Sequence, residues 1–159
     1  MFIDIHVHTM SFAKLPWAPG MECPATPEQL VEMYDDVGID QAVLLPFVIP
    51  ECNPITQCNE EMLMIAERFP GRFIPFCNID PRTFNNSASY DLSYVMNYYK
   101  DQGCKGIGEM TANLPFDDPR VTNLFDHAEK CSLPVTFHVA DRNHDIYGLI
   151  DQFGLPGLE

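Results

Sequence analysis

The sequence predicts an α/β fold in which parallel strands alternate with helices. Apolar, β-prone segments recur at intervals of about 30 to 40 residues, and amphipathic helical patterns lie between them. Such alternation is typical of parallel strands joined by right-handed crossovers. It fits either a (β/α) barrel or an open, doubly wound sheet.

Five segments are expected to form the strands, and they begin near Phe2, Gln41, Phe73, Cys104 and Pro134. Helical spacing of apolar residues follows in the ranges 62–69, 92–99 and 121–128. An earlier helix is expected to start at Thr26-Pro27-Glu28-Gln29, which offers an N-cap, a first-turn proline and a capping-box glutamine. Asp118-Pro119 repeats the cap and the proline. A fifth helix is expected over residues 145–153.

The length of the repeating unit fits part of a barrel, although 159 residues would also be a natural length for a complete open sheet. Five βα units of about 31 residues fill the chain, and eight such units would give roughly the 250 residues of a closed barrel. We therefore expect residues 1–159 to be the N-terminal five-eighths of a single (β/α)8 TIM-barrel-type domain, a fragment of a longer protein. A complete five-stranded open sheet is the alternative, although no Gly-rich phosphate fingerprint follows the first strand.

Composition and charge exclude several classes of protein. The chain is 46% hydrophobic and 20% charged, as in soluble globular proteins, and no apolar run reaches the roughly 18 residues of a membrane span. The first residues lack the pattern of a secretory signal, so we expect a cytoplasmic protein. A net charge of −14 disfavours nucleic acid as a partner. The six cysteines form no C-x-x-C pair and are expected to be reduced thiols.

The first strand carries the main chemical signal. In a regular strand Asp4, His6 and His8 share one face, and the apolar residues between them face the helices. The histidines fall at the carboxyl end, where barrel enzymes build their sites, so they can converge on one cation. We predict His6 and His8 as metal ligands, the alternative being hydrogen-bonded strand histidines. Asp4 is expected to orient a ligand rather than to bind metal.

Two further strand ends carry metal-competent side chains. Glu109 ends the fourth strand, on the same face as Lys105 and Ile107, and is predicted as a metal ligand, a bridge between two metals or a catalytic base. A solvated carboxylate is the alternative. His138 lies near the end of the fifth strand and is predicted as a ligand, although a core histidine would also fit. Their convergence with His6 and His8 on one rim favours the site.

Substrate-binding candidates lie in the adjoining loops. Arg142 and His144 fall in a polar loop after the fifth strand, and Arg142 could hold a substrate carboxylate or form a surface ion pair. Asn78, at the end of the third strand, is a weaker candidate of the same kind. His127 lies on a helical pattern beside charged residues and is expected to be a solvated surface residue.

These residues resemble the amidohydrolase superfamily, and within it the amidohydrolase-related (amidohydrolase 2) group of metal-dependent hydrolases and decarboxylases. The resemblance rests on the opening motif Ile3-Asp4-Ile5-His6-Val7-His8, on residues 30–46 and 67–73, and on His138. It implies a (β/α)8 barrel with one or two divalent metals, zinc or manganese, held by His6, His8 and His138. Glu109 fits the fourth-strand glutamate of some branches. Residues 106–109 also resemble the metal-dependent deoxyribonuclease branch, which the acidic charge disfavours.

The resemblance implies that metal-activated water attacks an amide, ester or lactone carbonyl of a small molecule. A decarboxylase acting on carboxylated aromatic substrates is the alternative, and a non-catalytic metal-binding barrel or scaffold is an alternative of another class. The sixth-strand histidine and eighth-strand aspartate of the family have no counterpart in these 159 residues. We therefore expect the chain alone to be inactive, and its unpaired sheet edges to favour a homo-oligomer.

Overall fold

The computed structural model describes residues 1–12, 15–16, 19–49, 51, 55–140 and 148–151, and it shows parallel strands alternating with helices. The helices are α1 (Pro27–Val37), α2 (Asn59–Arg68), α3 (Ser93–Gln102) and α4 (Pro119–Lys130). The strands are β1 (Ile3–Val7), β2 (Gln41–Leu44), β3 (Phe73–Pro75), β4 (Ile107–Met110), β5 (Val135–Phe137), β6 (Val139–Ala140) and β7 (Leu149–Ile150). The predicted α/β class is confirmed.

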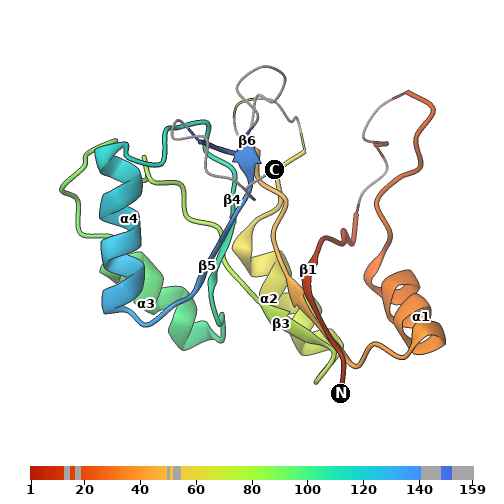
Figure 1. Ribbon diagram of the computed structural model, residues 1–159. Coiled ribbons are helices and arrows are strands. Elements are labelled where there is room, and N and C mark those ends of the chain that lie inside the picture. Colours follow the sequence, from red (N-terminus) through yellow and green to blue (C-terminus); the bar gives the residue numbers. More distant parts are fainter. Residues whose placement is uncertain (13–14, 17–18, 50, 52–54, 141–147, 152–159) are drawn as a thin grey trace.

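The first five strands lie side by side in chain order. β1, β2 and β3 form one parallel sheet, and β4 pairs with β5 in parallel. Lys105 N–H donates to the Pro75 carbonyl at 2.8 Å, and Cys77 N–H donates to the Gly106 carbonyl at 3.0 Å, so backbone hydrogen bonds also join the end of β3 to the segment entering β4. Their carboxyl ends therefore meet at one rim, toward the top of Figure 1. Over the described residues β1 pairs with β2 alone, and the strands do not close into a barrel.

The predicted helix starts are confirmed. The Thr26 side chain accepts a hydrogen bond from Gln29 N–H, and the Gln29 side chain accepts one from Thr26 N–H at 2.9 Å, which completes a capping box. Asp118 caps α4 by accepting from Arg120 N–H at 2.9 Å. Gly38 ends α1 in the left-handed conformation, with φ of 79°, where a side chain would be disfavoured.

The predicted fifth helix is wrong where the structure describes it. Residues 149–150 form β7, which pairs in parallel with β6, because Leu149 N–H donates to the His138 carbonyl and the Leu149 side chain is fully buried. Periodicity cannot separate a short buried strand from a helical turn in so few apolar residues. The rest of the predicted helix lies outside the described residues.

Two hydrophobic clusters fill the space between strands and helices. The first joins α1 and α2 to β2 and β3, and its buried residues are Leu30, Tyr34, Ala42, Leu44, Met62, Ile65 and Phe73. The second joins α3 and α4 to β4, and its largest fully buried members are Leu92, Met96, Ile107, Met110, Val121, Leu124 and Leu149. We call them the β1–β3 core and the β4–β5 core.

Irregular pairing in β1 changes which side chains share a face. Asp4 lies opposite Ala42 and Val7 lies opposite Leu44, so β1 contains one residue more than β2 between these pairs. The predicted shared face therefore holds for His6 and His8, whose Nε2 atoms lie 3.2 Å apart, but is wrong for Asp4. Asp4 accepts a hydrogen bond from Tyr34 of α1 at 2.6 Å, on the helix-covered side, and Ile5 is 74% exposed instead of packing under helices.

The same irregularity occurs in β4. Ile107 pairs with Val135 and Met110 with Phe137, so Gly108 and Glu109 together lie opposite Thr136. Ile107 is buried in the β4–β5 core, whereas the Glu109 side chain points toward the histidines of β1. The prediction that Ile107 and Glu109 share one face is wrong, because the bulge shifts the alternation between them.

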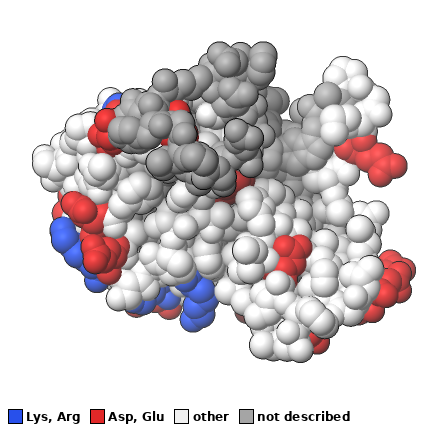
Figure 2. Space-filling model, in the orientation of Figure 1, with Lys and Arg blue, Asp and Glu red and all other residues white. Residues whose placement is uncertain are grey.

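The surface is strongly acidic, in keeping with the net charge of −14. Asp and Glu side chains are prominent at the α1 end of the face shown in Figure 2. Among the described residues, no helix combines the length and the apolarity that a membrane crossing requires.

Candidate metal centre

His6 and His8 meet at the carboxyl end of β1. Their Nε2 atoms lie 3.2 Å apart, and the two rings are in an edge-to-face arrangement. His8 Nδ1 lies 2.9 Å from the Leu45 carbonyl, which can only accept a hydrogen bond, so Nδ1 carries the proton in the neutral ring. The lone pair of His8 is therefore on Nε2, the atom that faces His6.

Glu109 brings a carboxylate from β4 to these histidines. Its Oε2 lies 3.2 Å from His8 Nε2, and its Oε1 lies 3.5 Å from His6 Nε2. Burial raises the pKa of Glu109, but protonated histidines outweigh burial: a hydrogen bond from protonated His8 and the charges of His6, His8 and His138 hold the pKa below its ordinary value. Protonated histidines thus stabilise the ionised form of a carboxylate on a residue that is only 7% exposed.

His138 follows β5 and approaches Glu109 from the other side. Its Nδ1 lies 3.2 Å from Glu109 Oε1. The β4 and β5 backbones hold this contact, since His138 N–H donates to the Met110 carbonyl at 2.9 Å. Three histidines from two strands thus surround one buried carboxylate.

The spacing of these donor atoms suits a tetrahedral metal ion. With metal–nitrogen distances of about 2.0–2.1 Å, two ligands of a tetrahedral zinc ion lie roughly 3.3 Å apart. The separation of 3.2 Å between His6 Nε2 and His8 Nε2 matches this value. Glu109 meets the two rings through different oxygens, with Oε1 3.5 Å from His6 and Oε2 3.2 Å from His8. Within the described residues, these three form the one cluster of His, Cys, Asp or Glu side chains compact enough to hold a cation. Two imidazoles and a carboxylate are a donor set that zinc accepts.

The substrate-binding candidates have different outcomes. Arg142 and His144 lie outside the described residues. Asn78 lies beside the centre, and its side-chain amide donates to the backbone carbonyl of Glu109. That contact indicates support of Glu109, and substrate binding by Asn78 stays a prediction.

The sequence did not identify two residues, Tyr34 and Leu45, as hydrogen-bond partners of Asp4 and His8. Tyr34 donates to Asp4, and Asp4 in turn accepts from His6 N–H at 3.0 Å, so α1 is connected to the first histidine. Leu45 acts through its carbonyl group, which no sequence pattern distinguishes from any other.

His127 is buried, and the prediction that it is a solvated surface residue is wrong. Only 9% of it is exposed. Its Nδ1 lies 2.7 Å from Ser93 Oγ and 3.3 Å from Asp91 Oδ1, so it joins α4 to the start of α3. Because serine and aspartate share one ring nitrogen, this trio has the geometry of a structural link and not of a nucleophile relay.

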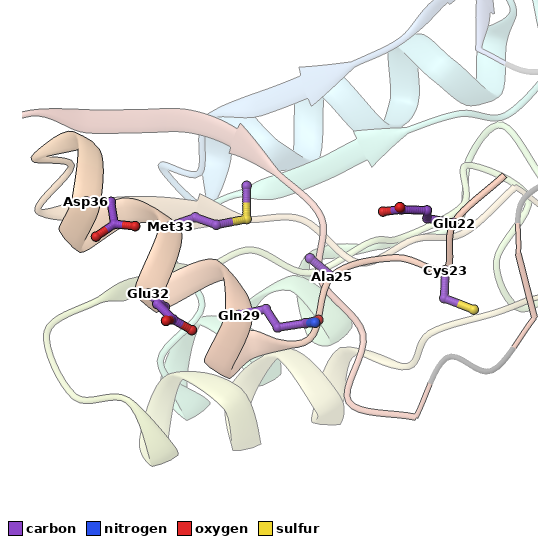
Figure 3. Close-up of a pocket in the computed structure, with 7 residues that line it drawn as sticks. All are labelled: Glu22, Cys23, Ala25, Gln29, Glu32, Met33 and Asp36. Carbon is purple, nitrogen blue, oxygen red and sulfur yellow. The ribbon is translucent and has the colours of Figure 1, made fainter.

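A separate cavity of about 330 Å³ lies between α1 and the loop that precedes it. Figure 3 shows its lining residues, which are Glu22, Cys23, Ala25, Gln29, Glu32, Met33 and Asp36. None of them belongs to the histidine cluster. The cavity therefore plays no part in the candidate centre.

Solved structures share this fold. An uncharacterised TIM-barrel protein from Bordetella bronchiseptica matches with a TM-score of 0.63 and 20% identity over 89% of this chain and 56% of its own. A protein described as amidohydrolase II matches with a TM-score of 0.59 and 15% identity over 92% of this chain and 54% of its own. A probable 2-pyrone-4,6-dicarboxylic acid hydrolase from Acinetobacter baumannii matches with a TM-score of 0.56 and 17% identity over 87% of this chain and 49% of its own.

These matches show a shared fold, and the chain spans about half the length of the solved structures it resembles. No protein-family model matches the sequence, and no curated protein matches it. The similarity is to TIM-barrel and amidohydrolase-II-like proteins, which agrees with the resemblance inferred from the sequence.

Proposed function

We propose that this chain contributes the metal centre of a hydrolase of the amidohydrolase type. The observation that carries the proposal is the convergence of His6, His8 and Glu109, whose ligand atoms lie within 4.8 Å of one another, with His138 against the same carboxylate. A divalent cation, zinc in our proposal, would supply a bound water of lowered pKa and would polarise a substrate carbonyl.

The residues have distinct parts in this proposal. His6 and His8 would bind through Nε2, and the Leu45 carbonyl holds His8 in the required tautomer. The Glu109 carboxylate, with Oε2 3.2 Å from His8 Nε2, would bind the cation or serve as a general base. His138 would complete the ligand set or hold Glu109 in place.

The proposed substrates are small molecules with an ester, lactone or amide carbonyl. The match to a probable 2-pyrone-4,6-dicarboxylic acid hydrolase supports lactones, since a 2-pyrone ring is a cyclic ester. Attack of water on that carbonyl breaks the ring C–O bond and gives a carboxylate. We further propose that the 159 residues alone bind the cation without turning over substrate, because the matched structures are about twice as long.

Elemental analysis tests the centre directly. The protein, free of any histidine tag, is equilibrated with zinc, passed through a desalting column and compared with a His6→Ala, His8→Ala double variant. We expect one zinc per wild-type chain and none in the double variant. His127→Gln is the matched control, because His127 lies outside the cluster and its variant should retain zinc.

Either of two results would overturn the proposal: zinc-free wild-type protein, or full retention of zinc by the double variant. The reaction itself is tested in a protein that includes this chain, with lactones followed by acid release and carboxylated aromatics followed by CO₂ release. Acid release that is lost in the double variant supports the hydrolase, whereas CO₂ release supports the decarboxylase.

A further inference from the structure

We infer that Asn78 is a positioning residue that sets the place of Glu109 in the metal centre, and that Asn59 holds Asn78 for this purpose. The inference rests on the proposed function, because it concerns how a proposed ligand is held. The residues involved lie at the start of α2, just beyond β3 and at the end of β4.

The backbone of Glu109 lies at an irregularity in the pairing of β4 with β5. Gly108 and Glu109 both lie opposite Thr136, so the β4–β5 ladder is interrupted at the residue that carries the carboxylate. The side-chain amide of Asn78 donates to the Glu109 carbonyl at this point. A buried carbonyl without a donor would cost about 1–3 kcal/mol, so this contact favours one backbone position.

Asn78 is itself held at both of its backbone groups. Asn78 N–H donates to Asn59 Oδ1 at 2.8 Å, and Asn59 Nδ2 donates to the Asn78 carbonyl at 3.0 Å. Asn59 is the first residue of α2 and is therefore fixed by the helix. Because the clamp acts on the backbone, a change of the Asn78 side chain leaves the clamp intact and removes only the donor to Glu109.

The chain of contacts thus runs from α2 through Asn59 and Asn78 to the Glu109 backbone. Glu109 must meet His6 and His8, which come from the β1–β3 core, although Glu109 itself belongs to a strand of the β4–β5 core. The chain neighbours of Asn78, Cys77 and Ile79, pack in the β4–β5 core. The connection to the β1–β3 core is therefore made by Asn59, which begins α2, a helix whose buried residues pack in that core. Loss of such supporting partners typically weakens metal binding about 10–100-fold.

The test compares Asn78→Asp and Asn78→Ala with a matched control, Asn123→Asp. Aspartate keeps the size of asparagine but cannot donate, and alanine removes the donor without adding charge. In α4, Asn123 Nδ2 donates to the Tyr90 carbonyl at 3.0 Å, so Asn123→Asp removes the same kind of contact with the same change of charge. Zinc affinity is measured by competition with a chelator, and circular dichroism checks that each variant is folded.

We expect both Asn78 variants to bind zinc about 10–100-fold more weakly than wild type, and the Asn123 control to bind as wild type does. A second readout is the visible spectrum at saturating Co²⁺, which reports ligand geometry. It should change in the Asn78 variants and remain unchanged in the control. A purely structural role would lower the thermal stability of all three variants and leave the saturated spectrum unaltered.

The outcomes separate the two proposals. If wild type binds zinc and the Asn78 variants match it in affinity and in Co²⁺ spectrum, the positioning role is overturned and the metal centre stands. If wild type binds neither cation, both proposals are overturned.

Discussion

Gly108 is the residue on which the approach of β4 to β5 depends. Its φ is +144°, a conformation that side chains rarely adopt, and a Cβ added there would lie 2.6 Å from the Thr136 carbonyl oxygen. Glu109 is the next residue, so the close approach of β4 to β5 also positions the backbone from which the Glu109 side chain extends. No larger residue fits this position without movement of the β5 backbone.

We predict that Gly108→Ala destabilises the protein more than Gly71→Ala. Gly71 also has a positive φ, +80°, but an added Cβ would meet no atom within 4 Å. The Gly71 variant should cost about 1–2 kcal/mol for the backbone conformation alone, and the Gly108 variant about 1–3 kcal/mol more for the clash. Denaturant unfolding measures both, and equal losses would contradict the predicted clash.

The sequence placed the residues of the centre correctly near strand ends but could not assign all of their faces. His6, His8, Glu109 and His138 meet because carboxyl ends of parallel strands share a rim, which the spacing of the segments predicts. The bulges in β1 and β4 depend on pairing with a neighbouring strand, so alternation within one segment cannot reveal them.

At the scale of elements, α1 is tied to β1 through a hydrogen bond in the β1–β3 core. Tyr34 is 6% exposed and donates to Asp4 at 2.6 Å. Burial raises the pKa of Tyr34 well above its ordinary value, and the hydrogen bond and charge of Asp4 raise it further. The phenol therefore stays neutral in the folded protein at a pH where an unfolded chain would ionise it.

We predict that Tyr34→Phe lowers the free energy of unfolding at neutral pH by about 1–3 kcal/mol, since Asp4 loses a donor. The raised pKa gives the sign of the pH dependence. The stabilising contribution of the neutral Tyr34 phenol is fully present below about pH 10, the pKa of tyrosine in the unfolded chain. It is lost as the pH rises above that value. The wild type should therefore lose stability more steeply than Tyr34→Phe between pH 10 and the onset of alkaline unfolding.

Tyr94→Phe is the control for this measurement, because Tyr94 is 76% exposed on α3. It should match the wild type in both stability and alkaline slope. Chemical unfolding followed at several pH values gives both quantities, and a Tyr34 variant that behaves as the Tyr94 variant does would refute the link between α1 and β1.

The order of elements followed from the sequence because helix signals are local. The capping box at Thr26, the aspartate cap at Asp118 and the glycine after α1 each act within one turn. The prediction of a helix around Leu149 was wrong because the structure there depends on a contact with another segment of the chain. The strand is created by pairing with β6, and two residues carry no periodicity of their own.

At the scale of the whole molecule, an apolar strand edge and a high negative charge oppose each other. Ile3 and Ile5 are 41% and 74% exposed on β1, which pairs on one side only over the described residues. Such edges favour association, whereas a net charge of −14 disfavours contact between copies. The balance between the two should depend on salt, which screens the charge.

We predict concentration-dependent self-association that increases with ionic strength and is reduced by Ile5→Lys. Met64→Lys makes the same change of charge at an apolar residue of α2 that is 63% exposed, and should leave association as in wild type. Sedimentation velocity at low and high salt measures this. Equal association of wild type and Ile5→Lys would show that the β1 edge is not the contact surface.

The division of the candidate ligands between two cores has a consequence for the stability of the molecule. His6 and His8 belong to the strand beside α1 and α2, whereas Glu109 and His138 belong to strands beside α3 and α4. A cation shared by both sets would cross-link the two cores, in addition to the backbone hydrogen bonds that join the end of β3 to the segment entering β4. At a thousandfold excess over its dissociation constant it would add about 4 kcal/mol to the free energy of unfolding, and its removal should lower that free energy by the same amount.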